Sequence, residues 1–310
     1  AGHNGMVGSA CWRFLKKQGH KNLIGKSSDQ LDLRNQKAVD DFIKQYQPDV
    51  IIDAAAKVGG ILANNTYPYP FLMDNLQIQN NLINAAYQYN VSKFIFLGSS
   101  CIYPRKSPQP IKEDELLNGP LEPTNQWYAI AKITGVKLCQ AIRQEFNKEF
   151  VSMMPTNLYG QKDNFDLKSS HVIPAMIRKF HEAKLDQQAD VTLWGDGSPL
   201  REFLHVDDLA NAVVFALKTN LSHHIYNVGS GTEISIKELA KVVQKVVGHR
   251  GEICWDTSKP NGTPRKLMDS TRIRQLGWTP TYSLEKGIKD TYQWFLQNSN
   301  SLKEVSFENQ

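Results

Sequence analysis

Apolar positions along the first half of the chain follow two spacings that alternate. Apolar residues three and four apart predict helices over 6–18, 35–46, 71–89 and 126–146. Short and nearly continuous apolar runs lie between them, at 22–25, 49–53, 93–98 and 150–154. Such runs are typical of parallel strands, because helices cover both faces of a parallel sheet. The alternation predicts an α/β fold with a doubly wound parallel sheet.

Shorter elements follow residue 155, in a different order. We expect helices over 172–183 and 207–218, strands over 191–194, 225–229 and 252–255, and three more helices after residue 235. We assign 1–160 with about 203–229 to the first domain. About 161–202 with 230–298 forms a smaller α/β domain that binds substrate across a cleft. The polar, aperiodic segment 299–310 is expected to be a disordered tail.

Composition excludes several classes of function. The net charge of +5 over 310 residues comes without a run of five or more basic residues, so no nucleic-acid partner is expected. No run of eighteen apolar residues is present, so no membrane span is expected, and no signal peptide is visible. The four cysteines are widely spaced, which predicts reduced thiols, no metal site and a cytoplasmic protein.

A glycine triplet lies at the start of the chain, at Gly2, Gly5 and Gly8, directly before the first predicted helix. Glycines in such a turn let the backbone approach a pyrophosphate, which the N–H groups of the helix N-terminus then hold. This motif makes the predicted sheet a Rossmann-type sheet that binds a nucleotide cofactor. A strand normally precedes the turn, and we expect one of roughly six to eight residues before Ala1 in the natural protein.

Tyr128 and Lys132 are four residues apart in the predicted helix 126–146, so both side chains project from one face. A nearby ammonium stabilises a phenolate, and we expect Lys132 to lower the pKa of Tyr128. The tyrosine would then donate a proton to a carbonyl oxygen that receives hydride. Two other pairs with this spacing, 89/93 and 282/286, straddle the ends of elements and are set aside.

Ser99 follows the buried strand 93–98, at the carboxyl end where ligands bind in open α/β sheets. Its hydroxyl can donate a hydrogen bond to a substrate carbonyl. The glycine triplet, this serine and the Tyr-xxx-Lys pair resemble the extended short-chain dehydrogenase/reductase family in order and separation. Segment 201–208 also resembles the second-half signature of that family.

Further segments narrow the resemblance to the GDP-L-fucose synthase family, from Ala1 to about Asn298. They are 54–61, 98–104, 121–125, 128–132, 154–160, 170–174 and 262–266. The resemblance implies conversion of GDP-4-keto-6-deoxy-D-mannose to GDP-L-fucose. The reactions are epimerisation at C3 and C5 and NADPH-dependent reduction at C4.

The resemblance implies Ser99, Tyr128 and Lys132 as the reductive triad, and Cys101 with His171 as the acid/base pair of epimerisation. Inverting a centre beside a ketone requires removal of a proton from one face and delivery of another to the opposite face. Thiol and imidazole suit this task because their ordinary pKa values bracket neutral pH. Ser99 and Tyr128 would stabilise the enolate-like oxygen.

The segment at the end of the predicted strand 22–25, Gly25 to Ser28, contains a cation and two hydroxyls but no acid. An acid there usually binds the 2′-hydroxyl of NAD, so Lys26 favours a 2′-phosphate and hence NADP(H). The resemblance implies a larger set of cofactor-binding residues, in which Asn4 stands where an arginine is expected. They are Gly2, Asn4, Gly5, Met6, Val7, Gly8, Lys26, Ser28, Asp32, Leu33, Leu97, Gly98, Lys132, Pro155, Asn157, Leu158 and His171.

For the GDP-sugar, the resemblance implies cations on the diphosphate and an aromatic ring against the base or sugar. The residues are Asn157, Lys179, Trp194, Arg201, Asn261 and Lys266, of which Asn261 departs from an expected acid. Two alternatives remain open. One is a nucleotide-sugar 4-epimerase or dehydratase, whose members usually carry Thr or Ser at the position of Cys101. The other is a non-catalytic NADP-sensing protein, which would not need the intact triad.

The two long predicted helices, 71–89 and 126–146, carry more apolar residues than one inward stripe requires. They are Leu72, Leu76, Leu82, Ile83 and Ala86 on the first, and Ile130, Ile133, Val136, Leu138 and Ile142 on the second. An exposed apolar surplus indicates a partner surface. We expect a homodimer in which a two-fold axis pairs these helices into a four-helix bundle.

Overall fold

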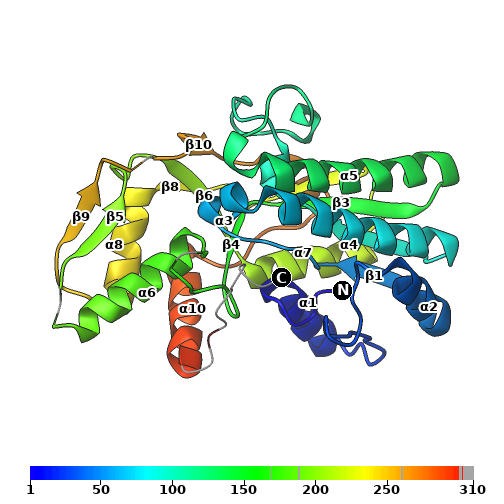
Figure 1. Cartoon of the computed structure of the whole chain (residues 1–310), viewed down its shortest axis with the longest axis horizontal. Coiled ribbons are helices and arrows are strands. Elements are labelled where there is room, and N and C mark those ends of the chain that lie inside the picture. The colour runs from blue at the N-terminus through cyan, green and yellow to red at the C-terminus, as the bar shows by residue number, and fades with distance from the viewer. Residues whose placement is uncertain (168, 188, 260, 300–301, 303–310) are drawn as a thin grey trace.

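The computed structural model describes residues 1–167, 169–187, 189–259, 261–299 and 302. Its main sheet has four parallel strands in the order β1-β2-β3-β7 (Figure 1). Their bounds are β1 Val50–Asp53, β2 Lys93–Leu97, β3 Glu149–Pro155 and β7 Ile225–Val228. The predicted tail at 299–310 lies outside the described residues, apart from residues 299 and 302.

Helices cover both faces of this sheet, as the buried strands predicted. On one face lie α2 (Gln36–Tyr46), α4 (Pro68–Gln88) and α5 (Gln126–Phe146). On the other lie α1 (Met6–Lys17) and α7 (Val206–Lys218), packed on each other. Strand β2 alternates between the two cores, since Phe94 and Phe96 enter the first and Ile95 and Leu97 the second. The prediction of a Rossmann-type, doubly wound fold is confirmed.

The second part of the chain contains two smaller sheets, on the left of Figure 1. Strand β6 (Leu200–His205) pairs with β4 (Asn157–Tyr159), β8 (Glu233–Ser235) and β10 (Arg265–Lys266), while β5 (Val191–Trp194) pairs with β9 (Ile253–Asp256). Helices α6 (Val172–Leu185), α8 (Ile236–Val247) and α10 (Leu284–Asn298) enclose a third apolar core. Strands β4, β6, β8 and β10 had no counterpart among the predicted elements, because their sequences lack long apolar runs.

The remaining elements are short. They are α3 (Ile61–Thr66), α9 (Thr271–Gln275) and the 3-10 turns Ser100–Ile102, Glu113–Glu115 and Pro123–Asn125. In the part of the chain that the structure describes, no helix is both long and apolar enough to cross a membrane.

The predicted strand at 22–25 is wrong, because this segment has no regular structure. A strand needs a hydrogen-bonded neighbour, and the main sheet ends at β1. At that edge Ala1 donates from its amino group to the carbonyl of Ile52 at 2.7 Å and accepts from the N–H of Ala54 at 3.3 Å. These two bonds anchor the glycine turn directly beside the carboxyl end of β1.

We predict that Gly135→Ala destabilises the fold, because a Cβ at Gly135 on α5 would lie 2.4 Å from Cζ of Phe96 on β2. Overpacking of this kind costs about 1–3 kcal/mol, more than the gain of up to about 1 kcal/mol that alanine brings to a helix. Urea unfolding measures the difference. Lys137→Ala, at an exposed position of the same helix, is the control and should stay within about 0.5 kcal/mol of the parent. An unchanged midpoint for Gly135→Ala would contradict this account of the α5–β2 contact.

Candidate functional site

The glycine turn has the shape of a phosphate-binding loop. Gly2 has φ +71°, and a Cβ there would lie 2.7 Å from the carbonyl of Ala54. A Cβ at Gly8 would lie 2.1 Å from the carbonyl oxygen of Gly2, so the first turn of α1 is pressed against the loop. Gly5 is the N-cap of α1 and offers no side chain to the N–H groups of the first turn. These N–H groups can therefore hold a pyrophosphate, whose charge the helix dipole stabilises.

The residues predicted to hold the adenosine end lie in the loop that follows α1. Lys26 and Ser28 are exposed, and among the ion pairs of the described residues none involves Lys26. Asp32 is already paired, since Arg34 lies 3.0 Å from its carboxylate and lowers the pKa of that group mainly by hydrogen bonding. Two carboxylates, Asp29 and Asp32, follow Gly25 in this stretch. Because Arg34 offsets the charge of Asp32, repulsion of a 2′-phosphate is weakened and the loop suits NADP(H). The sequence argument missed Arg34.

At the carboxyl end of β2, the chain turns through Ser99 and Cys101. Ser99 caps the short 3-10 turn that follows, and its hydroxyl accepts a hydrogen bond from the N–H of Cys101 at 3.4 Å. Lys132 reaches the same strand end from α5 and donates to the carbonyl of Leu97 at 2.9 Å. The structure thus brings the predicted serine, cysteine and lysine to one end of the sheet.

Tyr128 lies one helical turn before Lys132, with its ring 5.8 Å from the ammonium. The prediction that Lys132 lowers the pKa of Tyr128 is wrong, because burial raises that pKa, with Cys101 and Asp53 adding to the effect. The lysine is itself buried, and one of its N–H groups is directed to Leu97. Removal from water therefore decides the direction of the shift, and the tyrosine keeps its proton.

Cys101 and His171 come from different parts of the fold, since the first follows β2 and the second is the N-cap of α6. The imidazole makes no cap hydrogen bond and opens to solvent. Burial raises the pKa of the Cys101 thiol, whereas the surrounding protein lowers the pKa of His171. The ammonium of Lys266 is the largest charge acting on both groups. The charge of Lys266 therefore acts on both the thiol and the imidazole. The difference between the pKa values of these two groups is larger than in their unperturbed forms.

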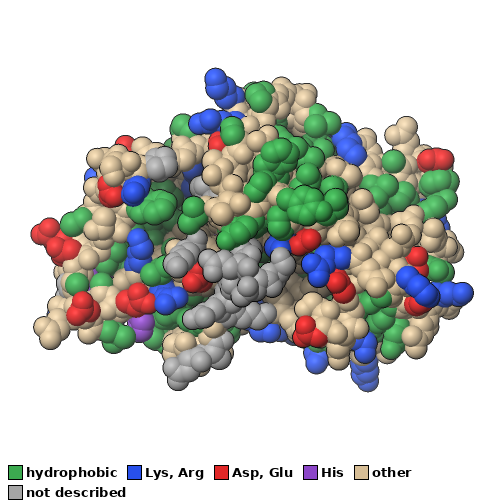
Figure 2. Space-filling model, viewed as in Figure 1, with side chains coloured by type: hydrophobic (Ala, Val, Ile, Leu, Met, Phe, Trp, Pro, Cys, Tyr) green, Lys and Arg blue, Asp and Glu red, His purple; other side chains and the backbone are tan. Residues whose placement is uncertain are grey.

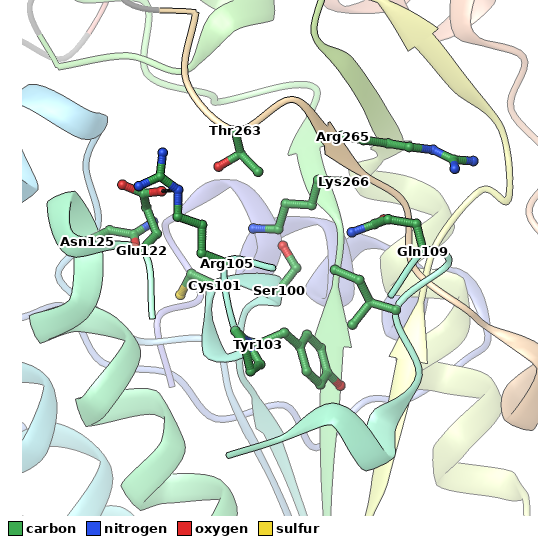
Figure 3. Close-up of a pocket in the computed structure, with 12 residues that line it drawn as sticks. Ser100, Cys101, Tyr103, Arg105, Gln109, Glu122, Asn125, Thr263, Arg265 and Lys266 are labelled. Atoms are coloured by element: carbon green, nitrogen blue, oxygen red, sulfur yellow. Dashed lines mark ion pairs between the residues drawn. The ribbon is translucent and has the colours of Figure 1, made fainter. Parts of the chain in front are cut away.

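Cys101 and Lys266 line one small cavity, together with residues from two other segments, 109–111 and 122–125 (Figure 3). In the close-up, Lys266 points toward Ser100 and Cys101, whereas its neighbour Arg265 points away. Arg265 pairs with Glu233 at 2.8 Å. On the far side of the cavity Arg105 and Glu122 form an ion pair at 3.1 Å. Lys266 is thus left as a cation directed into the cavity.

Three of the predicted substrate-binding residues are cations that no carboxylate neutralises within 4 Å among the described residues: Lys179, Arg201 and Lys266. Burial lowers the pKa of each of them. Within the part of the chain that the structure describes, Lys179 and Arg201 donate to the backbone carbonyls of Thr192 and Leu200. Arg201 and Lys266 lie side by side on β6 and β10. Holding unpaired cations away from water is costly, which favours an anionic ligand at this place.

The other predicted residues lie around this group. Trp194 at the end of β5 is 61% exposed, with the ammonium of Lys259 5.9 Å from its ring centre, and its exposed ring surface can stack on a ligand. Asn261 accepts a hydrogen bond at 2.9 Å from the N–H of Asp196, which lies two residues after Trp194. Asn157 on β4 donates to the carbonyl of Glu202 on β6 at 2.8 Å. Pro155 ends β3, and Leu158 packs against the α1/α7 core.

Sequence reasoning missed two buried carboxyls, Glu202 on β6 and Asp53 on β1. Glu202 is fully buried and accepts from the N–H groups of Gly231 at 2.6 Å and Met268 at 3.0 Å, which fixes β6 against the chain that follows Lys266. Asp53, at the end of β1, is also fully buried. No apolar pattern signals such residues, although a charged residue inside a predicted buried strand is itself unusual.

Comparison with known proteins agrees with the motifs. The model of the NAD dependent epimerase/dehydratase family matches residues 1–229. GDP-L-fucose synthase 1 of Arabidopsis thaliana is 56% identical over 298 residues, covering 96% of this chain and 92% of that protein. GDP-L-fucose synthase of Escherichia coli (strain K12) is 50% identical over 314 residues, covering 98% and 97%.

Among solved structures, the crystal structure of a GDP-L-fucose synthetase from Naegleria fowleri bound to NADP superposes with a TM-score of 0.89 at 29% identity. The match covers 98% of this chain and 94% of that one. Both the fold and the family predicted from the motifs are thus confirmed. The chain belongs to the NAD dependent epimerase/dehydratase family, within its group of GDP-L-fucose synthases.

Proposed function

We propose that this protein converts GDP-4-keto-6-deoxy-D-mannose to GDP-L-fucose, by epimerisation at C3 and C5 and NADPH-dependent reduction at C4. The observation that carries the proposal is that Cys101 and Lys266 line one cavity beside the strand end that holds Ser99, and that the charge of Lys266 also acts on His171. A direct test is whether the purified protein oxidises NADPH when this ketosugar is added. The likeness to GDP-L-fucose synthases supports the same activity.

For epimerisation, a protonated thiol and a neutral imidazole provide one acid and one base. Opposite pKa shifts of two titratable groups are how acid and base roles are divided within a site. His171 removes the proton from the carbon next to the ketone, and Cys101 returns a proton from the opposite face. The negative charge that develops on the ketone oxygen is stabilised by hydrogen bonds from Ser99 and Tyr128.

For reduction, NADPH supplies the hydride that adds to C4. Tyr128 donates its hydroxyl proton to the oxygen at C4, which its raised pKa keeps available. Lys132, held on the carbonyl of Leu97, provides the positive charge beside the phenolate that remains. Ser99 orients the same oxygen.

For the ligands, we propose that the N–H groups of α1 hold the pyrophosphate of NADPH and that Lys26 binds its 2′-phosphate. Lys179, Arg201 and Lys266 bind the diphosphate of the GDP-sugar, and Trp194 stacks on its base or sugar. Charge-assisted contacts of this kind are stronger than neutral hydrogen bonds.

We further propose two domains, 1–160 with about 203–229 and 161–202 with 230–298, with the site between them. Separate apolar cores support this division, and β6 crosses it, since Phe203 packs into the third core and Leu204 into the α1/α7 core. The cysteines, all free, are consistent with a reducing, cytoplasmic location.

Tyr128→Phe should abolish reduction while retaining cofactor binding, because the substitution removes only the donor hydroxyl. Loss of one proton-transfer group costs about 10²–10⁴-fold in rate. The measurement is NADPH oxidation at saturating ketosugar, with NADPH affinity followed by fluorescence. Oxidation at a near-normal rate would refute the donor role of Tyr128.

Cys101→Ser should separate the two reactions, since a hydroxyl is far less acidic than a thiol. Deuterium from D₂O should no longer enter C3 and C5, whereas reduction of the unepimerised ketone can persist. Mass spectrometry of the product measures the incorporation. Normal deuterium content would exclude Cys101 from epimerisation.

The protein should prefer NADPH to NADH, and Lys26→Glu should narrow that preference by repelling the 2′-phosphate. Titrations with both cofactors give the ratio of affinities. Lys21→Glu, at an exposed position of the same loop, is the matched charge control. If Lys26→Glu leaves the ratio unchanged, another group binds the phosphate.

We propose a homodimer that pairs α4 and α5 with their copies. Half of the ten apolar residues counted on these helices are buried within the chain: Leu82, Ile83, Ala86, Val136 and Ile142. The other five apolar residues are not fully buried, and further exposed apolar side chains lie on the same helices and on α3. Figure 2 shows hydrophobic side chains gathered over α3, α4 and α5. The exposed members are Leu62, Tyr69, Met73, Trp127 and Ile130. Exposed apolar surface of this kind marks an interaction site.

Sedimentation at micromolar concentration should therefore give the mass of a dimer. Ile130→Asp should shift it toward the monomer, because a charge placed within the patch must be buried on association. A monomer mass for the unmodified protein would reject the dimer.

A further inference from the structure

Asp53, at the carboxyl end of β1, has no part in the chemistry described so far. The residue is 0% exposed. Its Oδ1 accepts a hydrogen bond from the N–H of Ala55 at 3.1 Å, while Oδ2 is buried without a hydrogen-bond partner among the described residues. Buried polar atoms are nearly always paired, so an orphaned carboxylate oxygen requires an explanation.

The sheet register brings this carboxyl beside the lysine of the reductive triad. Asp53 is the direct neighbour of Phe96 on β2, and paired residues of parallel strands project to the same face. The ammonium of Lys132 lies 4.6 Å from the centre of the Phe96 ring and donates to Leu97, the next residue. The carboxyl and the ammonium therefore share one face of the sheet and flank the same aromatic ring.

Lys132 needs a counterion, because it is only 3% exposed. Among the described residues its hydrogen bond is to the neutral carbonyl of Leu97, which leaves further N–H groups for other partners. A buried ammonium without a nearby negative charge tends to lose its proton. Asp53 is the largest charge acting on Lys132, and Lys132 is the largest acting on Asp53.

We propose that Asp53 is a positioning residue for the C4 reduction, the carboxylate that keeps Lys132 protonated at the carboxyl end of β2. This inference rests on the proposed function, in which the charge of Lys132 supports proton donation by Tyr128. It also explains why an orphaned carboxylate oxygen is retained inside the sheet: the oxygen acts through its charge on the lysine.

Other titratable groups face this pair from the neighbouring elements. On the Lys132 side they are Tyr128 and Cys139 of α5 and Cys101 after β2, and burial raises the pKa of all three. On the Asp53 side the amino group of Ala1, whose pKa burial lowers, adds a positive charge when protonated. The thiols and the phenol are neutral near pH 7, so Asp53 is the group that can supply negative charge to Lys132.

The first test is the pH profile of reduction in Asp53→Asn. The amide retains the oxygen that accepts from Ala55 but removes the charge, so the pKa of Lys132 should fall. The alkaline limb of kcat/KM should then move to lower pH by about one unit or more. Asp53→Leu, which leaves no buried polar group, should move the limb in the same direction if the amide variant fails to fold.

Asp163 offers a matched control. Its Oδ1 accepts from the N–H of Asn164 at 2.8 Å and its Oδ2 is likewise buried and unpaired, but no charge of Lys132 acts on it. Asp163→Asn makes the same chemical change away from the lysine, and its alkaline limb should stay at the position of the parent. A limb that moves equally in both variants would overturn the proposal.

The second test needs neither substrate nor cofactor. NMR of ¹³Cε-labelled lysine, with the Lys132 signal assigned by Lys132→Met, should show a lower titration midpoint in Asp53→Asn than in the parent. Equal midpoints would overturn the counterion role even in an active enzyme. If the parent oxidises no NADPH but the midpoints differ, the proposed function fails while the counterion role stands.

Discussion

The hydrogen bond from Lys132 to the carbonyl of Leu97 is the contact on which the reaction centre depends. It fixes α5 to the carboxyl end of β2, where the chain turns into Ser99 and Cys101. Tyr128 is one turn away on the same helix, so its distance from Ser99 follows from this contact. The helix can come so close because Gly135 leaves room for the Phe96 ring. The local sequence of α5 and the packing of the sheet therefore determine the site together.

Burial has opposite consequences for the acids and the bases around this contact. It raises the pKa values of Tyr128 and Cys101 and lowers those of Lys132 and Lys266, while the protein around the exposed His171, including the charge of Lys266, lowers the pKa of the imidazole. The proton donors thus retain their protons, while the imidazole remains neutral and able to accept one. Without compensation, however, the same desolvation would discharge the lysine. The negative charge of a buried carboxylate such as Asp53 opposes this loss of the proton, although burial also raises the pKa of the carboxyl itself.

The second part of the fold contributes positive charge. Arg201 and Lys266 lie on paired strands, and the fully buried Glu202 fixes the backbone around them through two N–H groups. The carboxylate of Glu202 accepts its hydrogen bonds from backbone N–H groups and forms no ion pair with the cations beside it. In the proposed function, the diphosphate of the substrate binds these cations without competition from a protein carboxylate, and its sugar lies toward Cys101 and Lys266.

The sequence by itself determined the parallel sheet, the long helices and the Tyr-xxx-Lys pair, because these depend on local periodicity and on residue spacing within one element. It also determined the family, through motifs that are contiguous in the chain. Strand 22–25 was predicted wrongly, because a strand exists only with a partner that the local sequence cannot specify. Strands β4, β6, β8 and β10 were missed for the same reason, since their pairing joins distant segments. The tertiary structure alone decided the direction of each pKa shift, the proximity of Lys266 to both Cys101 and His171, and the burial of Asp53 beside Phe96. Desolvation and charge interactions depend on distances in space, which residue order does not contain.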